Sequence, residues 1–224
     1  MPVDLPNLRD VAGLTTAGGR TVRPGVLLRS ALPAPDDVVP SHVAWPPEVV
    51  IDLRSPIELA NGHPLAHVTS RVVNLPLLHA LRPGALASDS LSALYHLVLD
   101  ESAHLLVDVV HEVAHADGPV LVHCAAGKDR TGVSVALVLR LLDVPHQHVV
   151  DDYLLTEQAW EAIDARLHHD TEPKFPASYY QVLPEAIEAV LAAWDEHPRG
   201  VEGWYLDAGG VAETLTRLRD RMLD

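Results

Sequence analysis

Cysteine, lysine and aromatic residues are scarce in this sequence, and each scarcity excludes something. A single cysteine among 224 residues cannot form an intrachain disulfide, so nothing here requires an oxidising compartment. Aromatic residues make up 4% of the chain, so a core has to be built mainly from Ala, Val and Leu. Lys128 and Lys174 are the only lysines, and arginine supplies the other basic side chains.

Long apolar segments of the kind used for targeting and membrane insertion are also missing. The N-terminal segment MPVDLPNLRD has neither an apolar run nor a basic leader. No stretch reaches the roughly 18 uninterrupted apolar residues of a membrane span. We therefore expect a cytoplasmic protein without stable membrane association. Because no polar linker divides the chain, residues 1–224 are expected to form one domain.

Acidic residues outnumber basic residues by 31 to 16, which gives a formal net charge of −15. A negative field of this size disfavours nucleic acids and anionic membrane surfaces as partners. A local basic pocket remains compatible with it.

Short apolar or β-branched runs alternate with helical patterns along the chain. Strands are expected at residues 26–29, 49–53, 72–75 and 120–123, and helices at 88–99, 101–116, 131–142, 147–155, 157–168, 178–197 and 211–222. The proline-rich segment 32–47 is expected to be a surface connection with one or two helical turns. The pattern predicts an α/β fold with a mainly parallel central sheet of four or slightly more strands, flanked by helices. A ligand site is then expected at the carboxyl ends of the strands.

The segment GPVLVHCAAGKDRTGV, residues 118–133, carries the candidate chemistry. An apolar strand ends at Cys124 and an apolar helix opens at Arg130, with five residues between them. A helix N-terminus and a nearby guanidinium favour the thiolate, which is the nucleophilic form of cysteine. The N–H groups of a tight loop ahead of a helix form an anion nest. The predicted phosphate-binding residues are Ala125, Ala126, Gly127, Lys128, Asp129, Arg130 and Thr131.

Several residues of this segment have a predicted role in phosphoryl transfer or in shaping the loop. Arg130 would hold two oxygens of the phosphate with its planar fork. Asp129 would protonate the leaving oxygen and later activate water. Thr131 would donate a hydrogen bond to the sulfur of Cys124. His123 would orient the loop through backbone contacts, and Gly132 would let the helix pack closely on the sheet.

The sequence HCAAGKDRTG, residues 123–132, resembles the signature of the protein tyrosine phosphatase superfamily. Its Lys-Asp pair is similar to that of the bacterial tyrosine phosphatase B-like (Tyr phosphatase 3) branch. Segments 7–13, 23–25, 28–30, 50–58 and 201–206 are similar to other motifs of that branch. The resemblance implies the phosphatase fold and hydrolysis of phosphotyrosine in proteins, often with phosphoserine or phosphoinositide activity in the same pocket. It implies inorganic phosphate as product and neither metal nor other cofactor.

The resemblance also implies a helical lid, here within residues 156–193. Phe175, Tyr179 and Tyr180 would line its mouth or, as the more common alternative, belong to the core. The better-known tyrosine phosphatases carry their general acid on a Trp-Pro-Asp loop, and the segment AWPP at 44–47 lacks the carboxylate.

That departure leaves Asp129 as the acid, as in the similar loops of myotubularin-like lipid phosphatases. Asp52 is a second candidate, with a structural contact to Arg54 as its favoured alternative. Arg54 and Glu58 are expected to support the phosphate loop.

Several other functions compete with a protein phosphatase. A phosphoinositide phosphatase would use the same site, with Lys128 pairing with an additional inositol phosphate. A non-catalytic phosphate-binding module would keep the loop without turnover. A sulfur transferase usually lacks the Lys-Asp-Arg-Thr-Gly run, and an arsenate reductase needs a second cysteine.

One motif points to different chemistry. His111, Glu112 and His115 match the zinc-protease pattern His-Glu-x-x-His. The apolar residues of this helix fall on the opposite face, which favours a solvated surface over a metal site.

Overall fold

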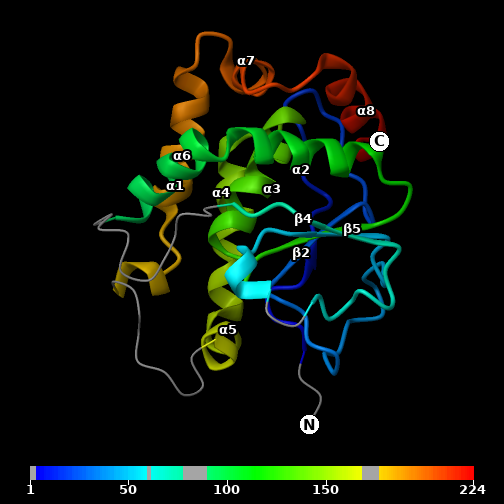
Figure 1. Ribbon diagram of the computed structural model, residues 1–224. Helices are drawn as coiled ribbons and strands as arrows, with labels where there is room; N and C mark the ends of the chain where they lie inside the picture. Colours follow the sequence, from blue (N-terminus) through cyan, green and yellow to red (C-terminus); the bar gives the residue numbers. More distant parts are fainter. Residues whose placement is uncertain (1–3, 60–61, 78–89, 168–176) are drawn as a thin grey trace.

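The computed structural model describes residues 4–59, 62–77, 90–167 and 177–224 (Figure 1). Its centre is a five-stranded sheet in the order β1-β2-β5-β3-β4. The strands are β1 (Arg9–Asp10), β2 (Leu27–Ser30), β3 (Val49–Asp52), β4 (Arg71–Asn74) and β5 (Val120–His123). All neighbours pair in parallel except β1, which lies antiparallel beside β2. The predicted mainly parallel sheet is confirmed, while β1 is too short to leave a pattern in the sequence.

Eight α-helices lie in the described part of the chain. They are α1 (Leu91–Glu101), α2 (Ala103–His115), α3 (Asp129–Leu141), α4 (His146–Leu154), α5 (Trp160–Leu167), α6 (Pro184–Glu196), α7 (Gly200–Asp207) and α8 (Ala212–Met222). Short 3₁₀ helices are η1 (Pro56–Leu59), η2 (Leu155–Ala159) and η3 (Ala177–Tyr180). Every predicted helix has a counterpart, and α7 covers the segment near 201–206 that resembles a family motif.

Segment 32–47 departs from the prediction, because it contains turns and bends and no helical turn. Five prolines lie between residues 33 and 47. Single turns form at Ala34–Asp37 and Pro40–Val43, but each proline lacks an N–H donor and so interrupts the hydrogen bonds that would extend a turn into a helix.

The two faces of the sheet are covered differently. Alternate strand residues such as Ile51 and Val122 join the main core with the helices. Those between them, such as Val50 and Leu121, form a second apolar cluster with side chains from segments that are not helical. In Figure 1 the helices lie above and to the left of the strands, the light blue and cyan connections lie to the lower right, and a dark blue connection runs up beside α8. Burial on both faces explains the continuous apolar runs in β2, β3 and β5.

The sheet register brings four polar residues to one edge. Ser30, His123, Asp52 and Asn74 end β2, β5, β3 and β4, and each is aligned with its neighbour across the sheet. The segment that follows His123 therefore emerges between the ends of two other strands. This is the carboxyl edge where a ligand site is expected. Among the described residues, no helix is long and apolar enough to cross a membrane.

Candidate active site

The loop that joins β5 to α3 is held from outside through its carbonyl groups. Asn7 Nδ2 and Arg29 Nη2 both donate to the Gly127 carbonyl, at 2.9 and 2.8 Å. The N–H of Leu32 donates to the Ala125 carbonyl at 3.0 Å. In a planar trans peptide the N–H points away from the C=O, so the N–H groups of these peptides turn to the inner side of the loop. Such inward-turned amides are the basis of an anion nest.

Two glycines permit this geometry for different reasons. Gly127 has φ of 67°, and a Cβ there would lie 2.2 Å from the Ser30 carbonyl oxygen, so no other residue fits without moving β2. A Cβ on Gly132 would lie 2.9 Å from Cδ2 of Tyr153. The close packing expected at Gly132 therefore exists, with a tyrosine of α4 as the nearest partner, and Nη2 of Arg29 on β2 would lie 3.9 Å from the same Cβ.

A buried ion-pair network lies behind the loop. Arg29 Nη1 lies 2.6 Å from Asp152 Oδ2, and Arg9 Nε lies 2.9 Å from Asp152 Oδ1. Only 1% of Arg29 and 6% of Asp152 is exposed. Burial opposes ionisation of Asp152, but the charges and hydrogen bonds of both arginines outweigh it and lower its pKa. Sequence analysis gave Asp152 no function; the structure makes it the anchor of Arg29, which holds the loop.

The guanidinium of Arg130 is held at two points by a carboxylate. Its Nη1 and Nη2 lie 2.7 and 2.9 Å from the two carboxylate oxygens of Glu58, and Nη1 also donates to the Leu53 carbonyl at 3.3 Å. Glu58 is fixed in turn by the N–H and hydroxyl of Ser55, each at 2.8 Å. Burial disfavours both charges, but the pairing prevails: the pKa of Glu58 falls to about 2. The pKa of Arg130 is raised by Glu58 and by the nearby charge of Cys124.

The carboxylate of Asp52 forms an ion pair with Arg54. It accepts from the backbone N–H of Arg54 at 3.0 Å and from Nη2 at 2.7 Å. Asn74 Nδ2 bridges the carbonyls of both residues. Burial raises the pKa of Asp52, but its hydrogen bonds to Arg54, together with the charges of His123 and Arg54, lower it by more. Asp52 is therefore found in the structural contact that was its alternative to an acid role, and Arg54 also supports Glu58 by donating to its carbonyl at 3.1 Å.

Asp129 opens α3 with one oxygen already bonded. Its Oδ1 accepts from the Tyr95 hydroxyl at 2.7 Å and lies 2.8 Å from Lys128 Nζ. Tyr153 lies 2.9 Å from the same hydroxyl, and burial followed by the charge of Asp129 raises the pKa of Tyr95. Lys128 is 1% exposed and also donates to the Gln181 carbonyl at 2.9 Å. In the described part of the chain, this ammonium therefore has two oxygen partners, Asp129 and the Gln181 carbonyl.

The nucleophile candidate lies at the base of the loop. Cys124 is 2% exposed and follows the last residue of β5. The Nδ1 of His123 lies 2.9 Å from the Cys124 carbonyl, which is the expected backbone contact. The hydroxyl of Thr131 is buried and has no hydrogen-bond partner among the described residues, so the predicted bond to the sulfur is not formed.

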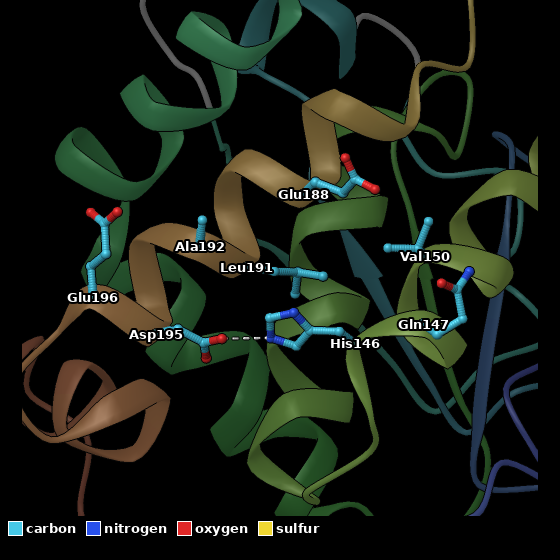
Figure 2. A pocket seen from close by; sticks show the side chains of 8 residues that line it. All are labelled: His146, Gln147, Val150, Glu188, Leu191, Ala192, Asp195 and Glu196. Atoms are coloured by element: carbon cyan, nitrogen blue, oxygen red, sulfur yellow. Dashed lines mark ion pairs between the residues drawn. The ribbon is translucent and has the colours of Figure 1, made fainter.

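A separate hollow of about 480 Å³ lies between α4 and α6. Figure 2 shows the residues that line it and the contact between His146 and Asp195, whose Nε2 and Oδ2 atoms lie 2.8 Å apart. No residue of the phosphate loop lines it. This hollow is therefore not part of the candidate active site.

The two helices of the segment predicted to contain a lid make different contacts. The helix α6 belongs to the core through buried residues such as Val190 and Trp194. The helix α5 is joined to segment 32–37 by Arg166, which forms an ion pair with Asp37 and donates to a carbonyl. Tyr179 packs against the core, and Phe175 lies outside the described residues.

Two other groups resemble metal ligands. His111 and His115 stack on the outer side of α2 with ring centroids 4.0 Å apart, and Glu112 pairs with Arg71, as a solvated face predicts. Atoms of Asp52, His63 and His123 lie within 4.8 Å of one another. Asp52 is bonded to Arg54, and the two imidazoles are bonded to each other, so this group fits a hydrogen-bond cluster.

A model of the tyrosine phosphatase family matches residues 3–224. The chain belongs to this family. Among curated relatives, the triple specificity protein phosphatase PtpB of Mycobacterium tuberculosis is 36% identical over 93 residues, covering 42% of this chain and 33% of PtpB. A tyrosine-protein phosphatase of Nostoc commune is 35% identical over 145 residues, covering 60% and 49%. The matched part of the chain thus spans about a third to a half of the length of these two relatives.

Two solved structures of P. aeruginosa TpbA are also similar to the chain. One has a TM-score of 0.43 and 19% identity, covering 85% of this chain and 91% of TpbA. The other, a variant in complex with pTyr, has a TM-score of 0.45 and 16% identity, covering 86% and 91%.

Within this tyrosine phosphatase family chain, the sequence analysis missed several residues that contact the loop or hold a residue that does. Asn7 and Arg29 lay in segments that resemble family motifs, which was the signal available for them. Tyr95 and Asp152 left no signal, because a single aromatic or acidic residue on a helix is usually part of the core or the surface.

Proposed function

We propose that this chain hydrolyses phosphate monoesters, with phosphotyrosine in proteins as the preferred substrate and a cysteinyl-phosphate at Cys124 as the intermediate. One observation carries the proposal: the carbonyls of the loop are bonded outward, so its amides turn inward ahead of Arg130. A ring of amides beside a guanidinium suits a dianion. Family membership supports the same reaction class.

The first step forms a sulfur–phosphorus bond and breaks the ester bond. The Cys124 thiolate attacks phosphorus, and the ester oxygen leaves with its electron pair and a proton from Asp129. Tyr95 and Lys128 hold Oδ1 of that carboxyl, which leaves Oδ2 for the proton transfer. The side chain of Asp129 is 25% exposed, so substrate can reach it.

While Glu58 binds the Arg130 guanidinium, one edge of that guanidinium remains free to bind the phosphate. In the part of the chain that the structure describes, Nη1 uses its hydrogens on Glu58 and Leu53, and Nη2 uses one on Glu58. A guanidinium has five N–H groups, so Nε and the second hydrogen of Nη2 stay available. Those two donors can bind two phosphate oxygens and stabilise their charge in the transition state.

The second step returns the enzyme to its starting state. Asp129, now ionised, takes a proton from water as the water oxygen attacks phosphorus. The sulfur–phosphorus bond breaks, the thiolate is restored and inorganic phosphate leaves. No metal ion takes part in either step.

Substrate preference rests on two features. The net charge of −15 opposes approach to an anionic membrane, where phosphoinositides lie. Lys128 is engaged with Asp129 and Gln181, away from an additional phosphate. Phosphotyrosine protein therefore ranks first and phosphoinositide second, although the M. tuberculosis relative is named a triple specificity phosphatase.

A substrate panel tests the proposal. We expect kcat/KM to be highest for a phosphotyrosine peptide, lower for a phosphoserine peptide and lowest for inositol phosphates, with and without chelator. A kcat/KM that is highest for inositol phosphates would favour the phosphoinositide alternative. Loss of turnover with chelator would contradict the metal-free mechanism.

Replacement of the acid gives a second prediction. We expect Asp129→Asn to lower kcat by about 10²- to 10⁴-fold for phenyl phosphate, a poor leaving group that needs protonation. The loss should be much smaller for 2,4-dinitrophenyl phosphate, whose leaving group departs as an anion. Glu161→Gln, on the exposed face of α5, serves as control. Equal losses with both esters would argue against the acid role.

A further inference from the structure

A series of hydrogen bonds reaches Cys124 from the turn that follows η1. The Leu65 N–H donates to His63 Nδ1 at 3.1 Å. His63 Nε2 lies 2.8 Å from His123 Nε2, and His123 Nδ1 lies 2.9 Å from the Cys124 carbonyl. His123 is completely buried and ends β5, whereas His63 is partly buried and lies 60 residues earlier in the chain.

Only one pair of neutral tautomers satisfies all three contacts. A backbone N–H can only donate, so His63 Nδ1 accepts and its proton is on Nε2. A backbone carbonyl can only accept, so His123 carries its proton on Nδ1 and has a bare Nε2. The proton on His63 Nε2 then fills the contact between the two rings. Each hydrogen bond in the series is therefore donated toward Cys124: from Leu65 to His63, from His63 to His123, and from His123 to the Cys124 carbonyl.

The surroundings keep both rings neutral. Burial lowers the pKa of His123, and burial followed by the neighbouring ring lowers the pKa of His63 to about 4. Arg54 and Arg130 also lower the pKa of His123, while Asp52 and the hydrogen bond to the Cys124 carbonyl raise it by less. The carboxylate of Asp52 lies 3.9 Å from His123 Nε2, beyond hydrogen-bond distance.

We propose that His63 is a positioning residue that fixes the His123 tautomer and, through it, the main chain at Cys124. The inference rests on the proposed function, since it concerns the same nucleophile. Without His63, the bare Nε2 of His123 would be a buried acceptor without a partner. The ring would then gain by moving its proton to Nε2 and turning it toward Asp52, which removes the hydrogen bond on the Cys124 carbonyl. A second imidazole that sets the tautomer of the first is the logic by which partners orient functional histidines.

Three variants test this role. His63→Leu removes the donor, and His63→Gln retains an N–H near the position of Nε2. His67→Ala changes an exposed histidine of the same segment and is the matched control. We expect kcat/KM for p-nitrophenyl phosphate to fall about 10- to 100-fold in His63→Leu, the usual cost of losing an orienting partner. Both His63→Gln and the control should stay within a few-fold of wild type.

Nitrogen-15 NMR of the histidine rings reads the tautomer directly, independent of turnover. The His123 signals should report Nδ1–H in wild type, His63→Gln and His67→Ala, and a shift toward Nε2–H in His63→Leu. If wild type shows Nε2–H, or if His63→Leu keeps Nδ1–H with unchanged kcat/KM, the positioning role is wrong. A tautomer change in a protein that hydrolyses no ester would keep the positioning role and refute the proposed function.

The pH dependence of stability provides a third readout, which tests whether the buried His63 ring is neutral beside His123, Asp52 and Arg54. The folded pKa of His63 is about 4, below the ordinary imidazole value of 6.5. The unfolded chain therefore binds more protons between these values, and the contribution of His63 to stability is present above pH 6.5 and lost as the pH falls toward 4. We expect wild type to lose more stability than His63→Leu over this interval. Parallel curves for the two proteins would contradict the neutral hydrogen-bonded state.

Discussion

Cys124→Ser should abolish phosphate ester hydrolysis while retaining affinity for a phosphotyrosine peptide. A serine hydroxyl is far less acidic than a thiol, so the helix and Arg130 cannot keep it ionised at neutral pH. The loss in kcat is expected to be on the order of 10⁶-fold, the scale seen when a covalent nucleophile is removed. The amides of the loop and the free edge of Arg130 are unchanged, so the ground-state binding site should persist.

Two measurements on wild type and Cys124→Ser decide the outcome. Release of p-nitrophenol reports turnover, and calorimetric titration with a phosphotyrosine peptide reports binding. Turnover in wild type only, with binding in both, supports a covalent phosphatase. Binding in both without turnover in either would favour the non-catalytic module, and turnover retained in the serine variant would assign the nucleophile elsewhere.

Asp152→Asn should cause the largest loss of stability. The substitution keeps the shape of the side chain but leaves Arg29, which is 1% exposed, without its counter-charge. Breaking a buried pair by removing one partner typically costs about 3 to 5 kcal/mol, since the remaining charge is buried and uncompensated. The free energy of unfolding, measured by urea denaturation, should fall by about that amount. Because Arg29 also holds the Gly127 carbonyl, affinity for phosphate should weaken in the fraction that stays folded.

The preceding residue provides the matched control. Asp151 is exposed and contacts Gln147 one helical turn away. Asp151→Asn removes the same charge from the same helix and should change stability by no more than about 0.5 kcal/mol. Similar losses for the two variants would show that net charge, not the buried network, explains the effect.

The elements that could be predicted from the sequence are those whose conformation depends on neighbouring residues in the chain. The strand β5, the loop and α3 follow from an apolar run, small residues and a second apolar run over residues 120–141, so residues close in sequence set their conformation. The strand β3 and the first half of β2 are also apolar and buried on both faces of the sheet. Segment 32–47 was mispredicted because its apolar residues suggested helical turns, whereas its prolines prevent a turn from extending into a helix.

Contacts between distant segments were not predictable in the same way. Arg130 meets Glu58 across 72 positions, and Arg29 meets Asp152 across 123. Which arginine meets which carboxylate depends on strand register and on the rotation of each helix about its axis, and neither is encoded in a local pattern. The same reason explains why the contacts of Lys128 with Asp129 and Gln181 were not predicted.

The sequence by itself determined the phosphate loop, its nucleophile candidate and the parallel sheet that carries them, because short-range chemistry and burial specify these. The tertiary structure alone decided what holds the loop in place. Asn7, Arg29 and His63 come from three separate segments and reach the loop or its preceding strand only after the sheet has formed. Their roles depend on distances between elements, and only the folded chain fixes those distances.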